Sequence, residues 1–180
     1  MVVVATLCHI IKGDHLLLKK ATRGISAGKW NAPGGKIIGK ETPLENAKRE
    51  VLEETGLKVN EATYHGAMEY YMWGKPTLHT RAHLFSTRHF RGRQESTSEG
   101  RLRWFKQNDL PFDQMWPDDR YWIPLALMGS QFNAKFYFDE TNSKVLRYII
   151  TSRETNDSET AKIDGTRRKV NRRLSKLLLA

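Results

Sequence analysis

Cysteine is almost absent from this sequence, which contains only Cys8 among its 180 residues. A single thiol cannot form an intramolecular disulfide or build a thiolate metal cage. No apolar run approaches the roughly 20 residues that a membrane-spanning helix needs. The apolar start, residues 1–7, has no basic residue before it and no cleavage-site pattern after it, so it does not resemble a signal peptide. We therefore expect a soluble protein in a reducing compartment, most simply the cytoplasm, with no membrane partner.

Acidic residues are also scarce relative to basic ones. Lys and Arg number 30 against 20 Asp and Glu, which gives a formal charge of +10 and a pI near 9.8. Such an excess attracts polyanions, so nucleotides and nucleic acids are both candidate partners. At 20.8 kDa with 39% hydrophobic residues, the chain is long enough for one domain with a real core and too short for two of ordinary size.

Strand-like segments make up much of the first 151 residues. Apolar runs at 2–11 and 15–19 flank a turn-forming Lys12-Gly13-Asp14, and a glycine-rich loop leads to a short strand at 36–38. Further strands are expected at 64–73, 77–87, 101–105, 132–138 and 144–151, with a helix at about 118–128. With the helix described next, this order predicts a mixed sheet with two helices packed on it, an α/β sandwich.

The clearest helix signal covers residues 43–55. Thr42 can cap it, Pro43 suits its first position, Glu45 completes a capping box, and Gly56 ends it. Its expected apolar face consists of Leu44, Ala47, Val51 and Leu52.

Glu50, Glu53 and Glu54 occur at i, i+3 and i+4 of this helix and should therefore project together. Three carboxylates on one turn repel one another unless they share a cation. Ligands that are all oxygen indicate a hard ion, so Mg²⁺, replaceable by Mn²⁺, is the expected occupant. The alternative is an acidic, solvated helix face.

A longer pattern contains these glutamates: Gly35, then Glu41 after five residues, then Arg49-Glu50-Val51-Leu52-Glu53-Glu54-Thr55-Gly56-Leu57 after seven more. It resembles the Nudix box at every specified position. The resemblance implies a Nudix-type α/β/α fold and a Mg²⁺-dependent hydrolase of nucleotide phosphoanhydrides. It also implies that the three glutamates and the Gly35 carbonyl hold the metal ion. One of the glutamates would serve as the base, and the sequence does not say which one. Glu41 and Arg49 would support the loop and helix.

Glu99 precedes the expected strand at 101–105. MutT-like members of the family carry a further metal-binding or basic glutamate at this place, so the resemblance makes Glu99 a candidate for the same role. A glutamate in a polar loop is otherwise a solvated side chain.

Two further segments, Gly24–Asn31 and Met115–Leu125, resemble the animal-type 8-oxo-dGTP diphosphatases within this family. The resemblance implies hydrolysis of oxidised purine nucleoside triphosphates to the monophosphate and pyrophosphate. It also implies that Asn31, Trp116, Asp118 and Asp119 bind the base. Alternatively, the two aspartates cap a helix and Asn31 shapes a turn. A departure is Ala32-Pro33, which restores the Pro-Gly-Gly of bacterial MutT and leaves the breadth of substrates open.

Residues 152–180 are expected to be a basic C-terminal tail, with eight Lys and Arg against four Asp and Glu. This extension either is solvated or contacts nucleic acid or an anionic surface. Two other functions are left open for the chain: a Nudix hydrolase of capped RNA, dinucleoside polyphosphates or ADP-ribose, and a nucleic-acid-binding module on a Nudix scaffold. A monomer is the favoured state.

Overall fold

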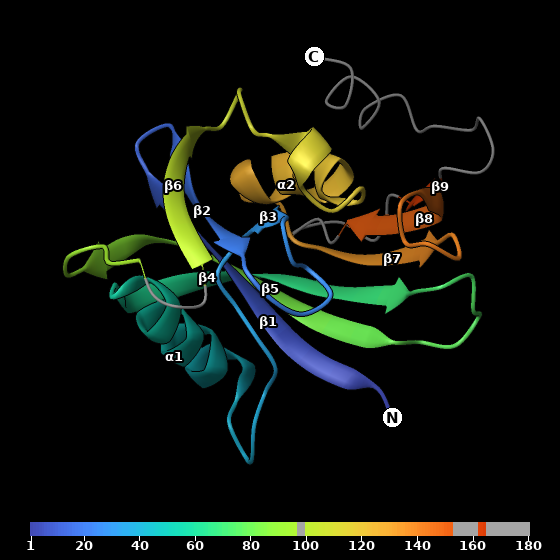
Figure 1. Ribbon diagram of the computed structural model, residues 1–180, viewed down its shortest axis with the longest axis horizontal. Helices are drawn as coiled ribbons and strands as arrows, with labels where there is room; N and C mark the ends of the chain where they lie inside the picture. Colours follow the sequence, from blue (N-terminus) through green and yellow to red (C-terminus); the bar gives the residue numbers. More distant parts are fainter. Residues whose placement is uncertain (97–99, 153–161, 165–180) are drawn as a thin grey trace. The chain divides into compact units, whose positions relative to one another are not determined.

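The computed structural model describes residues 1–96, 100–152 and 162–164, which form two compact units (Figure 1). The α1 unit comprises Val4–Tyr64 and His83–Trp116. The α2 unit comprises Met1–Val3, His65–Ala82 and the described residues from Pro117 onward. Each unit is described by itself below.

The sheet of the α1 unit has the strand order β3-β2-β1-β5-β4, with β6 also paired to β2. The strands are β1 (Val3–Lys12), β2 (His15–Ala21), β3 (Trp30–Asn31), β6 (Gly100–Lys106) and the parts of β4 (Lys58–Tyr71) and β5 (Thr80–Arg91) that lie in this unit. The predicted hairpin is confirmed, since Ile10 pairs with Leu17 and Lys12 with His15. Strand β2 pairs with β6 along its whole length, from His15 opposite Lys106 to Ala21 opposite Gly100.

Helix α1 (Pro43–Thr55) begins and ends as its sequence predicts. The Thr42 side chain and the Glu45 side chain form the reciprocal capping box, and Gly56 closes the helix with a left-handed backbone at φ 72°. The helix packs on the sheet through Ala47 and Val51, which are buried in a cluster with Leu17 of β2.

The predicted apolar face of α1 is only partly correct. Leu44 and Leu52 are 39% and 48% exposed, whereas the polar Asn46 and Glu54 are buried. Burial of a polar side chain is tolerated where hydrogen bonds replace those to water. Asn46 meets this condition because its Oδ1 accepts a hydrogen bond from Thr6 Oγ1 at 2.6 Å. The buried side of α1 therefore includes Glu54, one of the predicted metal ligands.

The α2 unit contains the remaining parts of β4 and β5 together with β7 (Phe132–Phe138), β8 (Val145–Ser152) and β9 (Lys162–Asp164), in the order β5-β4-β7-β8-β9. Strands β4 and β7 are parallel and β7 and β8 antiparallel, so the sheet is mixed as predicted. Helix α2 (Asp119–Leu127) contacts β8 through a stack of Tyr121 on Tyr148, with ring centroids 4.4 Å apart. In the part of the chain that is described, no helix is long and apolar enough to span a membrane.

Three local features differ from the prediction. The strand expected at 36–38 is reduced to a single bridge between Ala5 and Lys36, and Trp30–Asn31 forms β3 instead. A short 3₁₀ helix, η1 (Phe112–Gln114), precedes α2. Strand β9 comes from the segment predicted to be a tail and pairs with β8. The domain boundary at residue 151 stays a prediction, and most of the proposed tail lies outside the described residues.

Candidate functional site

The Gly34–Gly35 turn lies against helix α1 in the α1 unit. The Gly34 amide donates a hydrogen bond to Glu54 Oε2 at 3.0 Å. A Cβ at Gly35 would lie 2.5 Å from the carboxyl carbon of Glu50, and one at Gly34 would lie 2.1 Å from the Thr6 carbonyl oxygen. Gly34 therefore excludes a side chain, and a side chain at Gly35 would displace the Glu50 carboxylate from the backbone of the turn.

Glu54 is buried at this turn and forms an ion pair with Lys19 of β2. Burial raises the pKa of Glu54 to about 7, the Lys19 ammonium opposes this shift, and the charge of Glu50 adds to it. Burial also raises the pKa of Glu50. Glu50 and Glu54 repel each other when both are ionised and partly buried, and a cation bound between them would reduce this repulsion.

Arg49 binds three carboxylates around the exposed edge of the same helix. Its Nε lies 2.6 Å from Glu41 Oε1, its second terminal nitrogen 2.9 Å from Glu50 Oε1, and its first 2.8 Å from Glu53 Oε2. The hydrogen bonds from Arg49 and Asn46 lower the pKa of Glu41 to about 2. These contacts hold four neighbouring side chains together, and the supporting role of Arg49 and Glu41 stays a prediction.

The three predicted glutamates do not converge as expected. Glu50 and Glu54 interact at the turn, but Glu53 has a side chain 57% exposed and paired with Arg49. Within the described ranges, no set of three Asp, Glu, His or Cys side chains is gathered closely enough to hold a metal ion. Glu53 and Glu54 have different cationic partners, since Arg49 binds Glu53 and Lys19 binds Glu54.

The turn nevertheless fits a hard divalent cation. The carboxylates of Glu50 and Glu54 are oxygen donors, and both are placed beside backbone that lacks side chains. The Gly35 carbonyl accepts a hydrogen bond from the Thr6 amide at 2.9 Å, which uses one of its two lone pairs. Oxygen donors of this kind suit Mg²⁺ or Mn²⁺ better than softer metals. Glu99, the further predicted ligand, lies outside the described residues.

Asn31 and Trp116, two of the predicted base-binding residues, belong to the α1 unit. Asn31 Oδ1 accepts a hydrogen bond from the Ala32 amide at 2.8 Å, so this side chain does shape its own turn. The Trp116 indole donates to Ser26 Oγ at 3.0 Å, and Lys29 Nζ lies 5.3 Å from its ring centroid. Trp30 packs edge-on against Phe105 and is a core residue.

Asp118 and Asp119 belong to the α2 unit and are only 1% and 2% exposed. Asp118 occupies the N-cap of α2, but its side chain makes no capping hydrogen bond, so the capping alternative does not apply to it. Its Oδ2 accepts from Trp122 Nε1 at 2.9 Å, whereas its buried Oδ1 has no hydrogen-bond partner among the described residues. Most buried polar atoms have a hydrogen-bond partner, so this oxygen has the capacity to accept a further hydrogen bond.

Burial raises the pKa of Asp118 to about 6, and the hydrogen bond from Trp122 opposes the shift. The pKa of Tyr70 is in turn raised by burial and by the charges of Asp118 and Asp119. Trp122 follows Asp118 by one helical turn, so its contact could have been found from spacing. Tyr70 comes from β4, so only the fold brings its ring near Asp118.

The NUDIX domain family matches residues 1–126 of the chain. The chain belongs to the Nudix family. The family expected from residues 35–57 is thereby confirmed, and the protein is a Nudix hydrolase. Members of the family generally act with divalent metal ions, and their substrates are nucleotides.

Two relatives of the chain have the same name. The chain is 38% identical over 145 residues to the oxidized purine nucleoside triphosphate hydrolase of Mus musculus, covering 81% of this chain and 92% of the relative. It is 37% identical over 133 residues to the protein of the same name from Danio rerio, covering 74% and 85%. Among solved structures, it resembles the mutator MutT protein of Bacillus halodurans with a TM-score of 0.72, 26% identity and coverage of 83% and 97%.

Proposed function

We propose that the protein hydrolyses oxidised purine nucleoside triphosphates, such as 8-oxo-dGTP, to the monophosphate and pyrophosphate, and so removes damaged nucleotides from the cytoplasmic pool. The observation that carries this proposal is the buried Asp118–Asp119 pair, in which an Asp118 oxygen lacks a partner among the described residues. The names of the mouse and zebrafish relatives support the same substrate class.

The phosphate chemistry is assigned to the α1 unit. Glu50, Glu54 and the Gly35 carbonyl would hold Mg²⁺, with Glu53 and Glu99 as further predicted ligands. When bound, the metal ion supplies Lewis-acid stabilisation of the phosphate charge and lowers the pKa of water. The chain's own contribution is orientation: Lys19 holds Glu54, and Arg49 holds Glu50 and Glu53. One of the glutamates accepts the proton of the attacking water.

The purine is assigned to Asp118 and Asp119. Adjacent buried carboxyls titrate as a coupled pair, so one of them can keep its proton while the other is ionised. A protonated carboxyl donates a hydrogen bond and an ionised one accepts, which is the combination that the edge of a purine offers and requires. Asn31 and Trp116 stay predicted substrate contacts, the latter as a stacking surface.

A substrate panel tests this assignment. We expect kcat/KM with Mg²⁺ to be highest for 8-oxo-dGTP or another oxidised purine triphosphate such as 2-hydroxy-dATP, lower for dGTP, and lower still for ADP-ribose, a diadenosine polyphosphate and capped RNA. A preference for any of the last three would replace the proposed substrate while keeping the Nudix chemistry. Absence of turnover on the whole panel would favour a binding module on a Nudix scaffold.

A further inference from the structure

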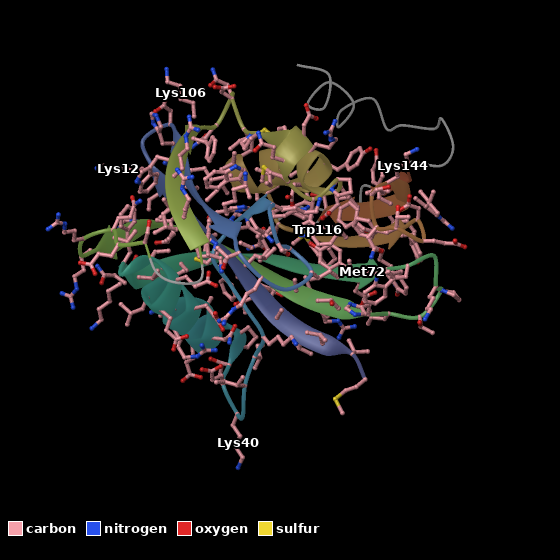
Figure 2. All side chains as sticks on the ribbon, viewed as in Figure 1. Lys12, Lys40, Met72, Lys106, Trp116 and Lys144 are labelled. Carbon is pink, nitrogen blue, oxygen red and sulfur yellow. The ribbon has the colours of Figure 1, made fainter. Side chains whose placement is uncertain are left out.

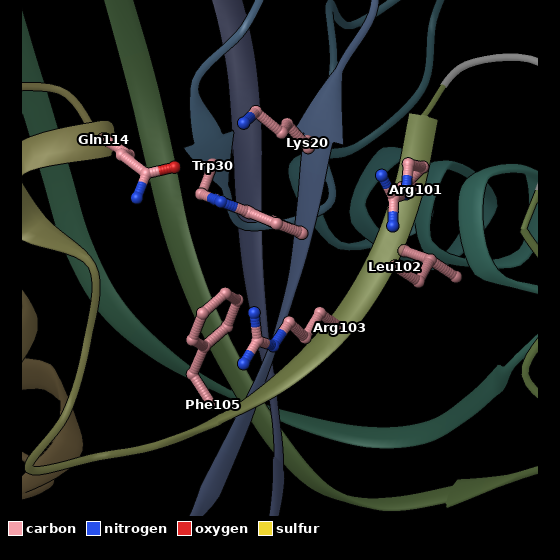
Figure 3. Close-up of a pocket in the computed structure, with 7 residues that line it drawn as sticks. All are labelled: Lys20, Trp30, Arg101, Leu102, Arg103, Phe105 and Gln114. Carbon is pink, nitrogen blue, oxygen red and sulfur yellow. The ribbon is translucent and has the colours of Figure 1, made fainter.

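A cavity of about 330 Å³ lies in the α1 unit, apart from the residues discussed so far as ligands of metal or base (Figure 3). Strands β2, β3 and β6 supply most of its walls, and Gln114 of η1 lines another side. The lining consists of Lys20, Trp30, Arg101, Leu102, Arg103, Phe105 and Gln114.

Strand register places the three cations of this cavity on the face of the sheet opposite the glutamates. Lys20 pairs directly with Trp30 of β3 and with Arg101 of β6, and directly paired residues share a face. Arg103 is two residues after Arg101 and therefore shares that face as well. Lys19, the next residue along β2, points to the other face, where it binds Glu54.

The cations of the cavity have no acidic partner in the described parts of the chain. Neither Lys20, Arg101 nor Arg103 forms an ion pair with the described carboxylates, and none of the lining residues is acidic. Like charges that stand directly opposite each other across two strands destabilise a sheet. Lys20 and Arg101 are such a pair, so an anion bound between them would remove a repulsion that the fold otherwise retains.

Aromatic rings contact two of these cations, Lys20 and Arg103. Lys20 Nζ lies 5.7 Å from the centroid of Trp30, and the Arg103 guanidinium lies 4.8 Å from that of Phe105. The two rings contact each other edge-on at 4.9 Å and are 8% and 9% exposed, so they form a rigid floor. Cations fixed in this way lose less conformational freedom when they bind a ligand.

We propose that this cavity is a second anion site and that it binds a compact polyphosphate, of which inorganic pyrophosphate is the simplest. Guanidinium groups match phosphoryl oxygens with paired N–H donors, and the Gln114 amide offers a further donor. The three cations line the same cavity of about 330 Å³, and this size favours a small, highly charged anion over a nucleic acid strand. The proposal does not depend on the proposed function, because binding at this site requires neither a metal ion nor turnover.

Calorimetric titration of the full chain with pyrophosphate, in buffer stripped of divalent metal ions and low in salt, tests the site. We expect saturable binding that is weakened at least about tenfold in Arg101→Gln/Arg103→Gln, because each lost guanidinium removes charge-assisted hydrogen bonds. The control is Lys106→Gln, which removes one charge from an exposed residue of the same strand that does not line the cavity (Figure 2). Its affinity should stay within about twofold of the wild-type value.

Three results would overturn the proposal. One is a lack of saturable binding by the wild-type protein whose circular dichroism and thermal unfolding show that it is folded. Another is an equal loss of affinity in Lys106→Gln, which would show only general attraction to a basic protein. The third is binding of a single-stranded oligonucleotide that depends on Arg101 and Arg103 and is not displaced by pyrophosphate, which would make this surface a nucleic-acid contact.

Discussion

Two regions of the molecule bury carboxylates, and they compensate them in different ways. In the α1 unit, Glu54 is paired with Lys19 and Glu50 with Arg49, so the compensation comes from cations. In the α2 unit, the Asp118 carboxyl accepts from the neutral indole of Trp122 and interacts with the phenol of Tyr70. Burial raises the pKa of carboxyls in both regions.

This difference separates two kinds of chemistry. A carboxylate that already has a cation beside it is kept ionised and oriented, which is the state in which it can bind a metal ion. Burial, not its neutral donor, raises the pKa of Asp118 to about 6, so this carboxyl keeps its proton to higher pH than an ordinary aspartate and can then donate a hydrogen bond to a base. The predictions below test each half of this comparison, beginning with the largest effect.

Glu53→Gln should lower kcat at least about a hundredfold while leaving the fold intact, because it removes charge that stabilises the transition state through the metal ion. Steady-state kinetics across a Mg²⁺ titration measures the effect. Glu45→Gln is the control: it removes a charge from the same helix but keeps an N3 side chain that can complete the capping box. Near-wild-type turnover of Glu53→Gln at saturating metal would sink the assignment.

Asp119→Ala should lower kcat/KM for 8-oxo-dGTP by a factor that corresponds to a loss of about 1–3 kcal/mol in transition-state binding. The reason is that a polar group of the buried substrate base loses its hydrogen-bond partner. Metal binding should be unchanged, since the glutamates lie in the other unit. Asp109→Ala, at an exposed position, is the matched control. Unchanged kcat/KM for 8-oxo-dGTP, 2-hydroxy-dATP and dGTP would rule out Asp119 as a base contact.

Stability should depend on pH through Asp118. Its folded-state pKa of about 6 lies above the ordinary value of 3.8, so the folded protein binds this proton more tightly than the unfolded chain does. The contribution to stability is therefore fully present below about pH 4 and is lost as the pH rises to about 6. The free energy of unfolding can be measured by denaturant at several pH values for the wild type and for Asp118→Asn. Between about pH 4 and 6 the wild type should lose roughly 1–2 kcal/mol more of this free energy than the variant. Parallel curves would contradict the neutral state of Asp118.

Truncation after residue 151 should have the smallest effect on catalysis. All the assigned glutamates and aspartates precede that point, so kcat/KM should stay within about threefold of the full-length value. A modest loss of thermal stability is expected because the pairing of β9 with β8 disappears. A truncated protein that is folded but inactive would show that the tail belongs to the site.

Local signals in the sequence were sufficient for helix α1 and for the family. The capping box of Thr42 and Glu45 and the left-handed Gly56 follow from interactions within a few residues, so they do not depend on the rest of the fold. The spacing of Gly35 and the glutamates likewise identified the Nudix box, because all the residues of that motif lie in one short segment, 35–57.

Tertiary structure alone decided how those residues are used. Periodicity placed Glu50, Glu53 and Glu54 on one helical turn. In the fold, Glu54 is buried and binds Lys19 of β2 and the Gly34 amide, whereas Glu53 is exposed and binds Arg49. Partners brought by strand pairing, such as Lys20 beside Arg101, are separated by about 80 residues and leave no local pattern. Periodicity reports which residues share a face, whereas charge compensation depends on what the fold places opposite that face.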